Sequence, residues 1–418
     1  MPHESNSTVT IVGGGIVGIC CALSLLEKGA GVRLIERDEP GQGTSLGNAG
    51  VISPWCCVPN SLPGVWLKAP RWLLDPEGPV TVRLNYLLQA MPWTLKFLAA
   101  GRGRRIPAIA DAMDALNRPN VDLYRHHLAG TGHEDLLRDC HYIYAYRRKA
   151  DADLGDLSWQ LRRDHGATLE VVDGHQLREI EPDLSPDFQA AIIAKDQARA
   201  LSPGRLGAVL ADKLRHLGGE IVRASVERLA PREGGGWHLT SSAGPFESKY
   251  VVMAAGAWSA RLLQPLGLDL PLEAERGYHM VFREPGVNLN HSIMAVDAMF
   301  VASSMEMGLR SAGTAEFAGL DAAPDYRRAR IFKRLTKRLV PGLNTEDCEE
   351  WMGTRPSFPD SLPCLGQIPG QPGLLAAFGH AHCGLMMAPM TGRVIADLAT
   401  GTPPNIDLAP YSAERFAP

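Results

Sequence analysis

Three glycines near the start of the chain constrain its fold more than any other feature. They stand in the pattern Gly13-x-Gly15-x-x-Gly18, between an apolar β-branched run at 9–12 and an apolar, helix-like run at 16–26. In such a unit the first glycine permits a sharp turn from strand to helix. The second lets the backbone approach a pyrophosphate, and the third lets the helix pack closely on the sheet. The pattern therefore predicts a parallel sheet with a dinucleotide at the start of the first helix.

An acidic residue after the next apolar run supports this interpretation. Residues 32–35 form that run, and Glu36 follows it directly. A carboxylate at this place accepts hydrogen bonds from an adenosine ribose and repels a 2′-phosphate, so NADP is disfavoured. The sequence has no second glycine motif of this kind for a separate nicotinamide site.

The far end of the chain favours FAD over an exchangeable NAD. Residues 250–258 form another apolar strand that ends in small residues, and residues 374–392 follow the order strand, glycine loop, helix. The second helix begins near 384–388, where its N-terminus can face an electron-rich ring or a ribityl phosphate. A cofactor held by both ends of the chain must be long and deeply enclosed, which suits FAD.

Composition excludes several classes of protein. The 418 residues include 21% charged and 45% hydrophobic residues, a balance typical of globular domains and not of disordered chains. The formal net charge of -4 gives no basic field that would attract nucleic acid. The eight cysteines form no C-x-x-C pair, and no signal peptide is evident, so we expect reduced thiols and a cytoplasmic location.

Several ordered motifs resemble those of one family. They are Gly13 to Gly18 with Glu36-Arg37, Gly43-Thr-Ser-Leu-Gly-Asn-Ala-Gly-Val-Ile-Ser53, Ala254-Ala-Gly-Ala-Trp-Ser259, Glu275-Arg-Gly-Tyr-His279, Gly353 to Pro363 and Gly379-His-Ala-His-Cys-Gly-Leu385. Over nearly its whole length the chain resembles the glycine oxidase/D-amino acid oxidase family of FAD-dependent amine oxidoreductases. Within that family it looks most like bacterial D-amino acid dehydrogenases, especially those acting on cis-4-hydroxy-D-proline.

The resemblance implies an α/β fold in which a Rossmann-type FAD-binding domain is interleaved with an α+β substrate domain on an antiparallel or mixed sheet. The FAD-binding domain would comprise residues 1–80, 190–270 and 345–418, and the substrate domain residues 81–189 and 271–344. FAD would be bound non-covalently, because neither Cys364 nor Cys383 has the context of a covalent attachment site. The residues expected to contact FAD are Gly13, Gly15, Ile16, Val17, Gly18, Glu36, Arg37, Thr44, Ser45, Asn48, Ala49, Gly50, Val51, Val226, Ala255, Gly256, Trp258, Gly353, Arg355, Gly379, His380, Gly384, Leu385 and Met386.

Four residues are candidates for the substrate side of such a site. The family places a carboxylate-binding arginine in the frame of Arg355, although an arginine here can also simply satisfy a proline-rich turn. Tyr278 would bond the carboxylate or pack in the sheet, and His279 would assist amine deprotonation or lie tethered in the core. Arg310 is a further candidate. We expect no metal site, since no third ligand accompanies the pair formed by His380 and His382.

The expected reaction is oxidation of the Cα–N bond of a D-amino acid or cyclic D-imino acid by hydride transfer to flavin N5, giving an imine. An oxygen-using amine oxidase acting on glycine, sarcosine or L-proline, a non-catalytic flavin-binding subunit and an NAD-linked dehydrogenase remain alternatives. The acceptor of a dehydrogenase would be a quinone or another redox protein.

Residues 65–74 and 84–100 are rich in Trp and Leu, and arginines follow at 102–105. This pattern suits either peripheral contact with the inner face of a membrane or an amphipathic pair packed on the domain.

Overall fold

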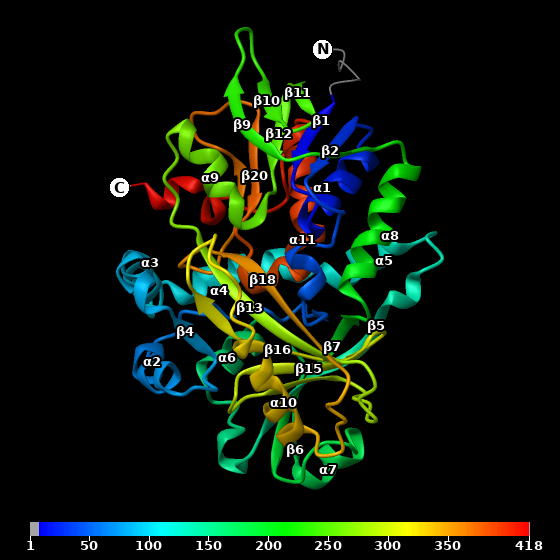
Figure 1. Ribbon diagram of the computed structural model, residues 1–418, viewed down its shortest axis with the longest axis vertical. Coiled ribbons are helices and arrows are strands. Elements are labelled where there is room, and N and C mark those ends of the chain that lie inside the picture. Colours follow the sequence, from blue (N-terminus) through cyan, green and yellow to red (C-terminus); the bar gives the residue numbers. More distant parts are fainter. Residues whose placement is uncertain (1–7, 418) are drawn as a thin grey trace.

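The computed structural model describes residues 8–417 and contains three β-sheets. The six-stranded sheet forms the upper half of Figure 1 and the eleven-stranded sheet the lower half. This mixed α/β architecture confirms the predicted fold class. The six-stranded sheet has the order β19 (Cys364–Gln367), β20 (Leu374–Phe378), β12 (Tyr250–Met253), β1 (Val9–Val12), β2 (Val32–Glu36) and β8 (Glu220–Arg223).

The six-stranded sheet has the parallel core that the glycine motif predicts. Strand β1 pairs in parallel with β2 and β12, and only the edge strand β19 runs antiparallel to its neighbour. Helices α1 (Ile16–Glu27) and α11 (Gly384–Ala399) pack closely because Gly392 carries no side chain. A Cβ there would lie 2.5 Å from the Cys20 carbonyl oxygen. Cys20 and Cys21 are fully buried and serve as small apolar residues.

The large sheet is mixed, with both parallel and antiparallel neighbouring strands. Its order is β3 (Val51–Ile52), β7 (Ala190–Ala200), β5 (Leu137–Tyr146), β14 (Ser292–Ala295), β15 (Phe300–Met305), β16 (Gly308–Ala312), β13 (Glu273–Phe282), β17 (Ala315–Phe317) and β4 (Val80–Val82), while β18 (Cys348–Ser357) pairs with β13 and β6 (Leu169–Asp173) with β7. Strands β7 and β18 pair in this sheet, although the boundaries expected from sequence place both in the FAD-binding part.

A smaller antiparallel sheet and the remaining helices complete the structure. The small sheet consists of β9 (Val226–Pro231), β10 (Trp237–Ser241) and β11 (Gly244–Ser248). The other helices are α2 (Val65–Leu74), α3 (Leu87–Ala100), α4 (Ile106–Asn117), α5 (Asn120–Leu128), α6 (Leu157–Asp164), α7 (Gly174–Ile180), α8 (Pro203–His216), α9 (Ser259–Leu263) and α10 (Arg327–Leu339). None of the described helices is long and apolar enough to cross a membrane.

Candidate active site

A cavity of about 1740 Å³ has walls from both large parts of the fold. Its lining includes the carboxyl ends of β1, β2 and β12, the first turns of α1 and α11, and one face of the large sheet. The volume exceeds the roughly 300–1,000 Å³ of a drug-sized ligand site, so a dinucleotide and a small substrate fit together. Every residue expected to contact FAD lines this cavity except Gly18 and Gly50.

The two exceptions shape the backbone around the cavity. A Cβ at Gly18 would collide with the Gly13 carbonyl oxygen, so this glycine allows the close packing of helix on strand that the motif predicts. Gly50 has φ +78°, and a Cβ there would lie 2.6 Å from the Ala200 carbonyl oxygen. Its role is to turn the chain into β3 beside β7.

Backbone and hydroxyl groups hold the glycine-rich end of the cavity in place. Glu36 accepts hydrogen bonds from the Gly14 N–H at 2.6 Å and from the Asp38 N–H at 3.0 Å. Ser45 Oγ accepts from the Ile16 N–H at 3.0 Å, at the first residue of α1. The Ser45 hydroxyl proton thus remains available to a cavity ligand.

The side chains at this end suit a nucleotide. The Arg37 guanidinium lies 3.9 Å from the centre of the Trp258 ring, and both residues line the cavity. A Cβ at Gly43 or Gly256, which also line the cavity, would meet no atom within 4 Å. These glycines leave open a cradle beside the helix N-terminus, where phosphate groups are stabilised. The residues present therefore fit FAD.

The loop before α11 is held by buried hydrogen bonds. His380 is fully buried, and its Nε2 lies 3.0 Å from Thr391 Oγ1. Burial lowers the pKa of His380 to about 3, so the ring is neutral at physiological pH. Beyond it the first residues of α11, from Gly384 to Met386, line the cavity. The Tyr124 hydroxyl fixes this turn by donating to the Leu385 carbonyl oxygen at 2.6 Å.

Arg355 borders the cavity from strand β18. Its Nη1 donates to Glu275 Oε1 at 2.8 Å and to the Thr314 carbonyl oxygen at 3.0 Å. Its guanidinium lies over Gly277, where any side chain would collide with it. The arginine is thus held by the neighbouring strand β13, with its remaining N–H groups free to take a carboxylate.

Glu275 gathers a polar cluster that sequence analysis did not foresee. Its carboxylate binds Arg355, accepts from Ser357 Oγ at 3.0 Å, and lies 2.8 Å from His382 Nε2. His382 Nδ1 in turn lies 3.0 Å from Asn60 Nδ2. Burial alone would raise the pKa of Glu275, but His382, Arg355 and Ser357 together lower it to about 2. The carboxylate therefore stays ionised and orients both basic side chains.

Tyr278 also lines the cavity, but its hydroxyl already has partners elsewhere, as in the second of the two roles considered for it. Its hydroxyl donates to Glu316 Oε2 at 2.6 Å and accepts from the Asp325 N–H at 2.9 Å. Its ring lies edge-on to Tyr326, in the core on the other face of β13 from Glu275. The side chain is held in a structural network, since strand alternation turns it away from Arg355.

His279 and Arg310 do not line the cavity, so the structure does not support their expected contact with substrate. His279 stacks on Trp351, and its Nδ1 lies 3.1 Å from the Gly47 carbonyl oxygen. Burial and the nearby Arg310 lower the pKa of His279 to about 3, a poor value for a base near neutral pH. Arg310 Nη1 donates to the carbonyl oxygens of Leu46 and Asn48, each at 2.7 Å. Both residues thus support the loop that lines the cavity.

Sequence analysis also missed a second guanidinium. Arg162 lines the cavity, stacks on the rings of Tyr144 and Trp159, and donates to the Tyr144 hydroxyl at 3.2 Å. Among the described residues it has no carboxylate within 4.0 Å. Basic residues on amphipathic helices usually face solvent, so nothing in the sequence of α6 marked Arg162 as a cavity residue.

Two cysteines from distant segments meet beside this arginine. The Sγ atoms of Cys56 and Cys383 lie 3.4 Å apart. The hydrogen bond from Cys383 and the charge of Arg162 lower the pKa of the Cys56 thiol. The structure thus brings together Arg162, Cys56 and the turn before α11, which the sequence places far apart.

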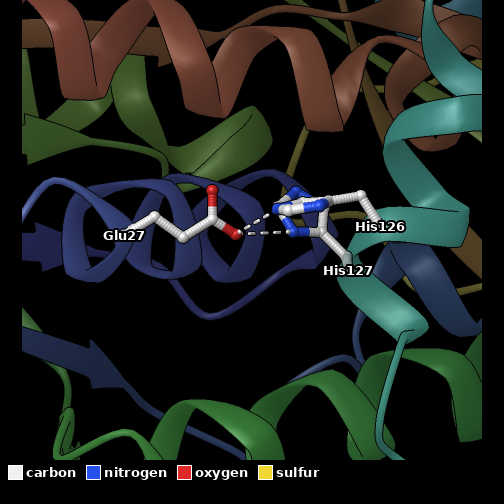
Figure 2. Close-up of side chains that lie close together, drawn as sticks. All are labelled: Glu27, His126 and His127. Atoms are coloured by element: carbon white, nitrogen blue, oxygen red, sulfur yellow. Dashed lines mark hydrogen bonds and ion pairs between the residues drawn. The ribbon is translucent and has the colours of Figure 1, made fainter.

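A further cluster of titratable groups joins α1 to α5 (Figure 2). Glu27 Oε1 lies 3.0 Å from His126 Nε2 and 3.5 Å from His127 Nδ1. The contact with His127 is the largest of several influences that lower the pKa of Glu27. None of the three residues lines the cavity, and we assign them to the packing of the two helices.

Comparison with known proteins identifies the family. The model of the family described as FAD dependent oxidoreductase (DAO) matches residues 8–398. The chain belongs to this family. It is therefore an FAD-dependent oxidoreductase, as predicted. The glycine motif of this DAO-family chain lies at the cavity described above.

Alignments with relatives cover nearly the whole length of the DAO-family chain. It is 36% identical over 415 residues to a protein named D-amino-acid oxidase from Bradyrhizobium diazoefficiens, covering 98% of each chain. It is 27% identical to a D-amino acid dehydrogenase from the same organism, covering 98% of this chain and 99% of the other. Glycine oxidase from Geobacillus kaustophilus has a similar fold, with a TM-score of 0.75, 24% identity and coverage of 99% and 100%.

Proposed function

We propose that the protein oxidises the Cα–N bond of a D-amino acid or a cyclic D-imino acid such as cis-4-hydroxy-D-proline. The observation that carries this proposal is the guanidinium of Arg355, fixed by Glu275 at the border of the cavity. Curated relatives along the whole chain are named for D-amino acids, which supports the stereochemistry. The product is an imine. Water then hydrolyses the imine of an acyclic amino acid, whereas the imine of a cyclic substrate stays part of the substrate ring.

Arg355 binds the substrate carboxylate and so fixes the position of the α-carbon. Tyr142 and Tyr144 in β5 and Met294 in β14 line the cavity and exclude water from the reacting atoms. Bound FAD supplies the acceptor for the hydride that leaves the α-carbon. The ammonium group gives up one proton to solvent, so that the substrate is oxidised as the neutral amine. Loss of the hydride from the α-carbon leaves an iminium ion, which releases a second proton to solvent to give the imine.

The test is anaerobic mixing of the purified protein with a panel of D- and L-amino acids and cis-4-hydroxy-D-proline, while the flavin absorbance is followed. We expect bleaching by D-substrates, and loss of bleaching in Arg355→Ala with FAD still bound. Arg283→Ala is a matched control, because Arg283 directly follows β13 and pairs with Glu349 at the surface. Bleaching by L-substrates alone would contradict the stereochemistry, and an unaffected Arg355→Ala would favour a non-catalytic flavin subunit.

The electron acceptor has two candidates. We propose a cytoplasmic dehydrogenase that passes electrons to a quinone or to another redox protein. The relative at 36% identity is named an oxidase, which supports oxygen as the second candidate. Air admitted to the reduced protein separates them: slow re-oxidation agrees with a dehydrogenase, and rapid re-oxidation with release of hydrogen peroxide agrees with an oxidase.

A further inference from the structure

Helix α3 and the turn before it carry an apolar stripe that is largely exposed in the described chain. The stripe consists of Leu84, Leu88, Met91, Leu95 and Leu98, whose spacing of three or four residues places them on one helical face. Leu84 and Leu88 are 86% and 80% exposed. In a helix packed on its own domain such a stripe is buried, so its exposure needs an explanation.

The attachment of α3 to the body uses a different face. Ala90, Trp93, Phe97 and Ala100 follow a second stripe, in which both alanines are buried and both aromatic rings are half-buried. Trp93 Nε1 donates to the Ser357 carbonyl oxygen at 3.1 Å, and its ring stacks on Phe97. The helix is therefore anchored already, and the outward stripe is not required for the fold.

Helix α2 continues this apolar surface. Trp66, Leu67, Leu73 and Leu74 are exposed there, Leu74 to 84%. Figure 1 shows α2 and α3 at the same edge of the molecule, on either side of β4. Together these residues and the α3 stripe form what we call the α2–α3 surface.

The charge around the α2–α3 surface is positive, in contrast to the chain as a whole. Exposed basic residues are Arg71 in α2, Lys96 in α3, and Arg102, Arg104 and Arg105 in the following turn. None of these five lies within 4.0 Å of a carboxylate in the described chain. The protein carries a formal net charge of -4, so this concentration of unpaired positive charge is local.

We propose that the α2–α3 surface seats the protein on an anionic phospholipid bilayer. The leucines and Trp66 would enter the boundary between headgroups and acyl chains, and the arginines would contact lipid phosphates. Binding of this kind strengthens with the apolar area inserted and with attraction to anionic lipids, and the exposed leucines and the basic residues of the α2–α3 surface supply both.

The cavity reaches the α2–α3 surface, so docking on a bilayer would place the mouth of the cavity at the lipid. Trp66, Leu73 and Leu74 of α2 and Leu98 of α3 are exposed and also line the cavity. An apolar electron acceptor dissolved in the bilayer would therefore meet the mouth of the cavity directly. This consequence rests on the proposed dehydrogenase activity, whereas the docking itself does not.

The test is co-sedimentation of the FAD-loaded protein with phosphatidylcholine vesicles, with and without phosphatidylglycerol. We expect binding to the anionic vesicles and about a tenfold loss of bound protein in Leu88→Glu/Leu95→Glu and in Arg102→Gln/Arg104→Gln/Arg105→Gln. Leu157→Glu/Leu217→Glu is the matched control, because these leucines are exposed elsewhere, to 40% and 51%. Flavin absorbance and anaerobic bleaching by a D-amino acid verify that each variant is folded.

Two results would overturn the proposal. The first is native protein that stays in the supernatant with anionic vesicles, or variants that bind as well as the native protein does. The second is a dimer in sedimentation velocity that Leu88→Glu/Leu95→Glu converts to a monomer, combined with no vesicle binding, since the surface would then join two copies. Loss of bleaching with vesicle binding intact would instead refute only the proposed function.

Discussion

The contact between Arg355 and Gly277 offers a way to displace the guanidinium without removing it. A Cβ at Gly277 would lie 2.5 Å from Arg355 Nη1, and closer still to Nη2 and Cζ. Ordinary van der Waals contact begins at 3.4 Å, so Gly277→Ala must shift the guanidinium by about 0.9 Å or more. Gly277 has no positive φ, and alanine therefore adds no backbone strain.

The size of the effect follows from this displacement. A misplacement of about 1 Å of a positioning group lowers the rate of reaction by about 10²-fold. We therefore expect kcat/KM of Gly277→Ala for a D-amino acid to fall by about 10²-fold, equivalent to about 2.7 kcal/mol of transition-state stabilisation. The FAD content should not change, because the substitution leaves the glycine motif between β1 and α1 unaltered.

The assay is anaerobic stopped-flow bleaching of the flavin over a range of substrate concentrations. Gly103→Ala serves as the control, since a Cβ there meets no atom within 4 Å. Thermal unfolding of each variant shows whether the fold is intact. Native kcat/KM in a folded, FAD-loaded Gly277→Ala protein would refute the assignment of Arg355 as the group that positions the substrate.

Three further changes separate cofactor binding, charge balance and packing. Ser45→Ala removes a hydroxyl donor that lines the cavity, together with the acceptor that holds the Ile16 N–H, so the FAD dissociation constant should rise about fivefold in fluorescence titration of the apoprotein. An unchanged constant would exclude this hydroxyl from the binding site. Glu275→Gln should lower the free energy of unfolding in denaturant by a few kcal/mol at neutral pH. Because the folded pKa is about 2 and the ordinary value 4.5, this contribution is complete above about pH 4.5 and is lost as the pH falls toward 2. A difference that stays constant with pH would contradict this account. Tyr278→Phe should lower the free energy of unfolding by about 1–2 kcal/mol and leave kcat/KM unchanged, since the hydroxyl binds Glu316 and Asp325. The opposite pattern would return Tyr278 to the substrate site.

The parts of the fold that depend on local sequence were predictable. The glycine motif predicted β1, α1 and β2 to within a residue of their observed ends. A Ser-Pro pair is likewise a local helix-start signal, and at the start of α8 Ser202 Oγ accepts from the Arg205 N–H. These signals succeed because turns, caps and apolar periodicity act over a few neighbouring residues.

The polar partners in the site were not predictable, because they depend on strand register. Glu275 meets Arg355 only because β13 and β18 pair with these two residues opposite each other. His382 reaches the same carboxylate from the turn before α11. No local pattern specifies such pairings between segments far apart in the chain. Arg162 was missed for the related reason that its helix gives no sign of which face borders the cavity.

Side chains from Glu275 to Tyr278 alternate between the two faces of strand β13, so one sequence motif contributes both to the cavity and to a buried network on the other face. Glu275 lies on the same face of β13 as Gly277 and holds Arg355 beside the cavity. Arg276 and Tyr278 point the other way and meet the buried carboxylate of Glu316, Arg276 at 3.3 Å. Both partners of this Arg276 ion pair are fully buried. Because both groups sit on one strand, the Glu316 network fixes the position of β13 and, through it, the register that places Glu275 opposite Arg355. The buried network is therefore a precondition for the position of the proposed carboxylate clamp, although none of its polar atoms needs to touch the substrate.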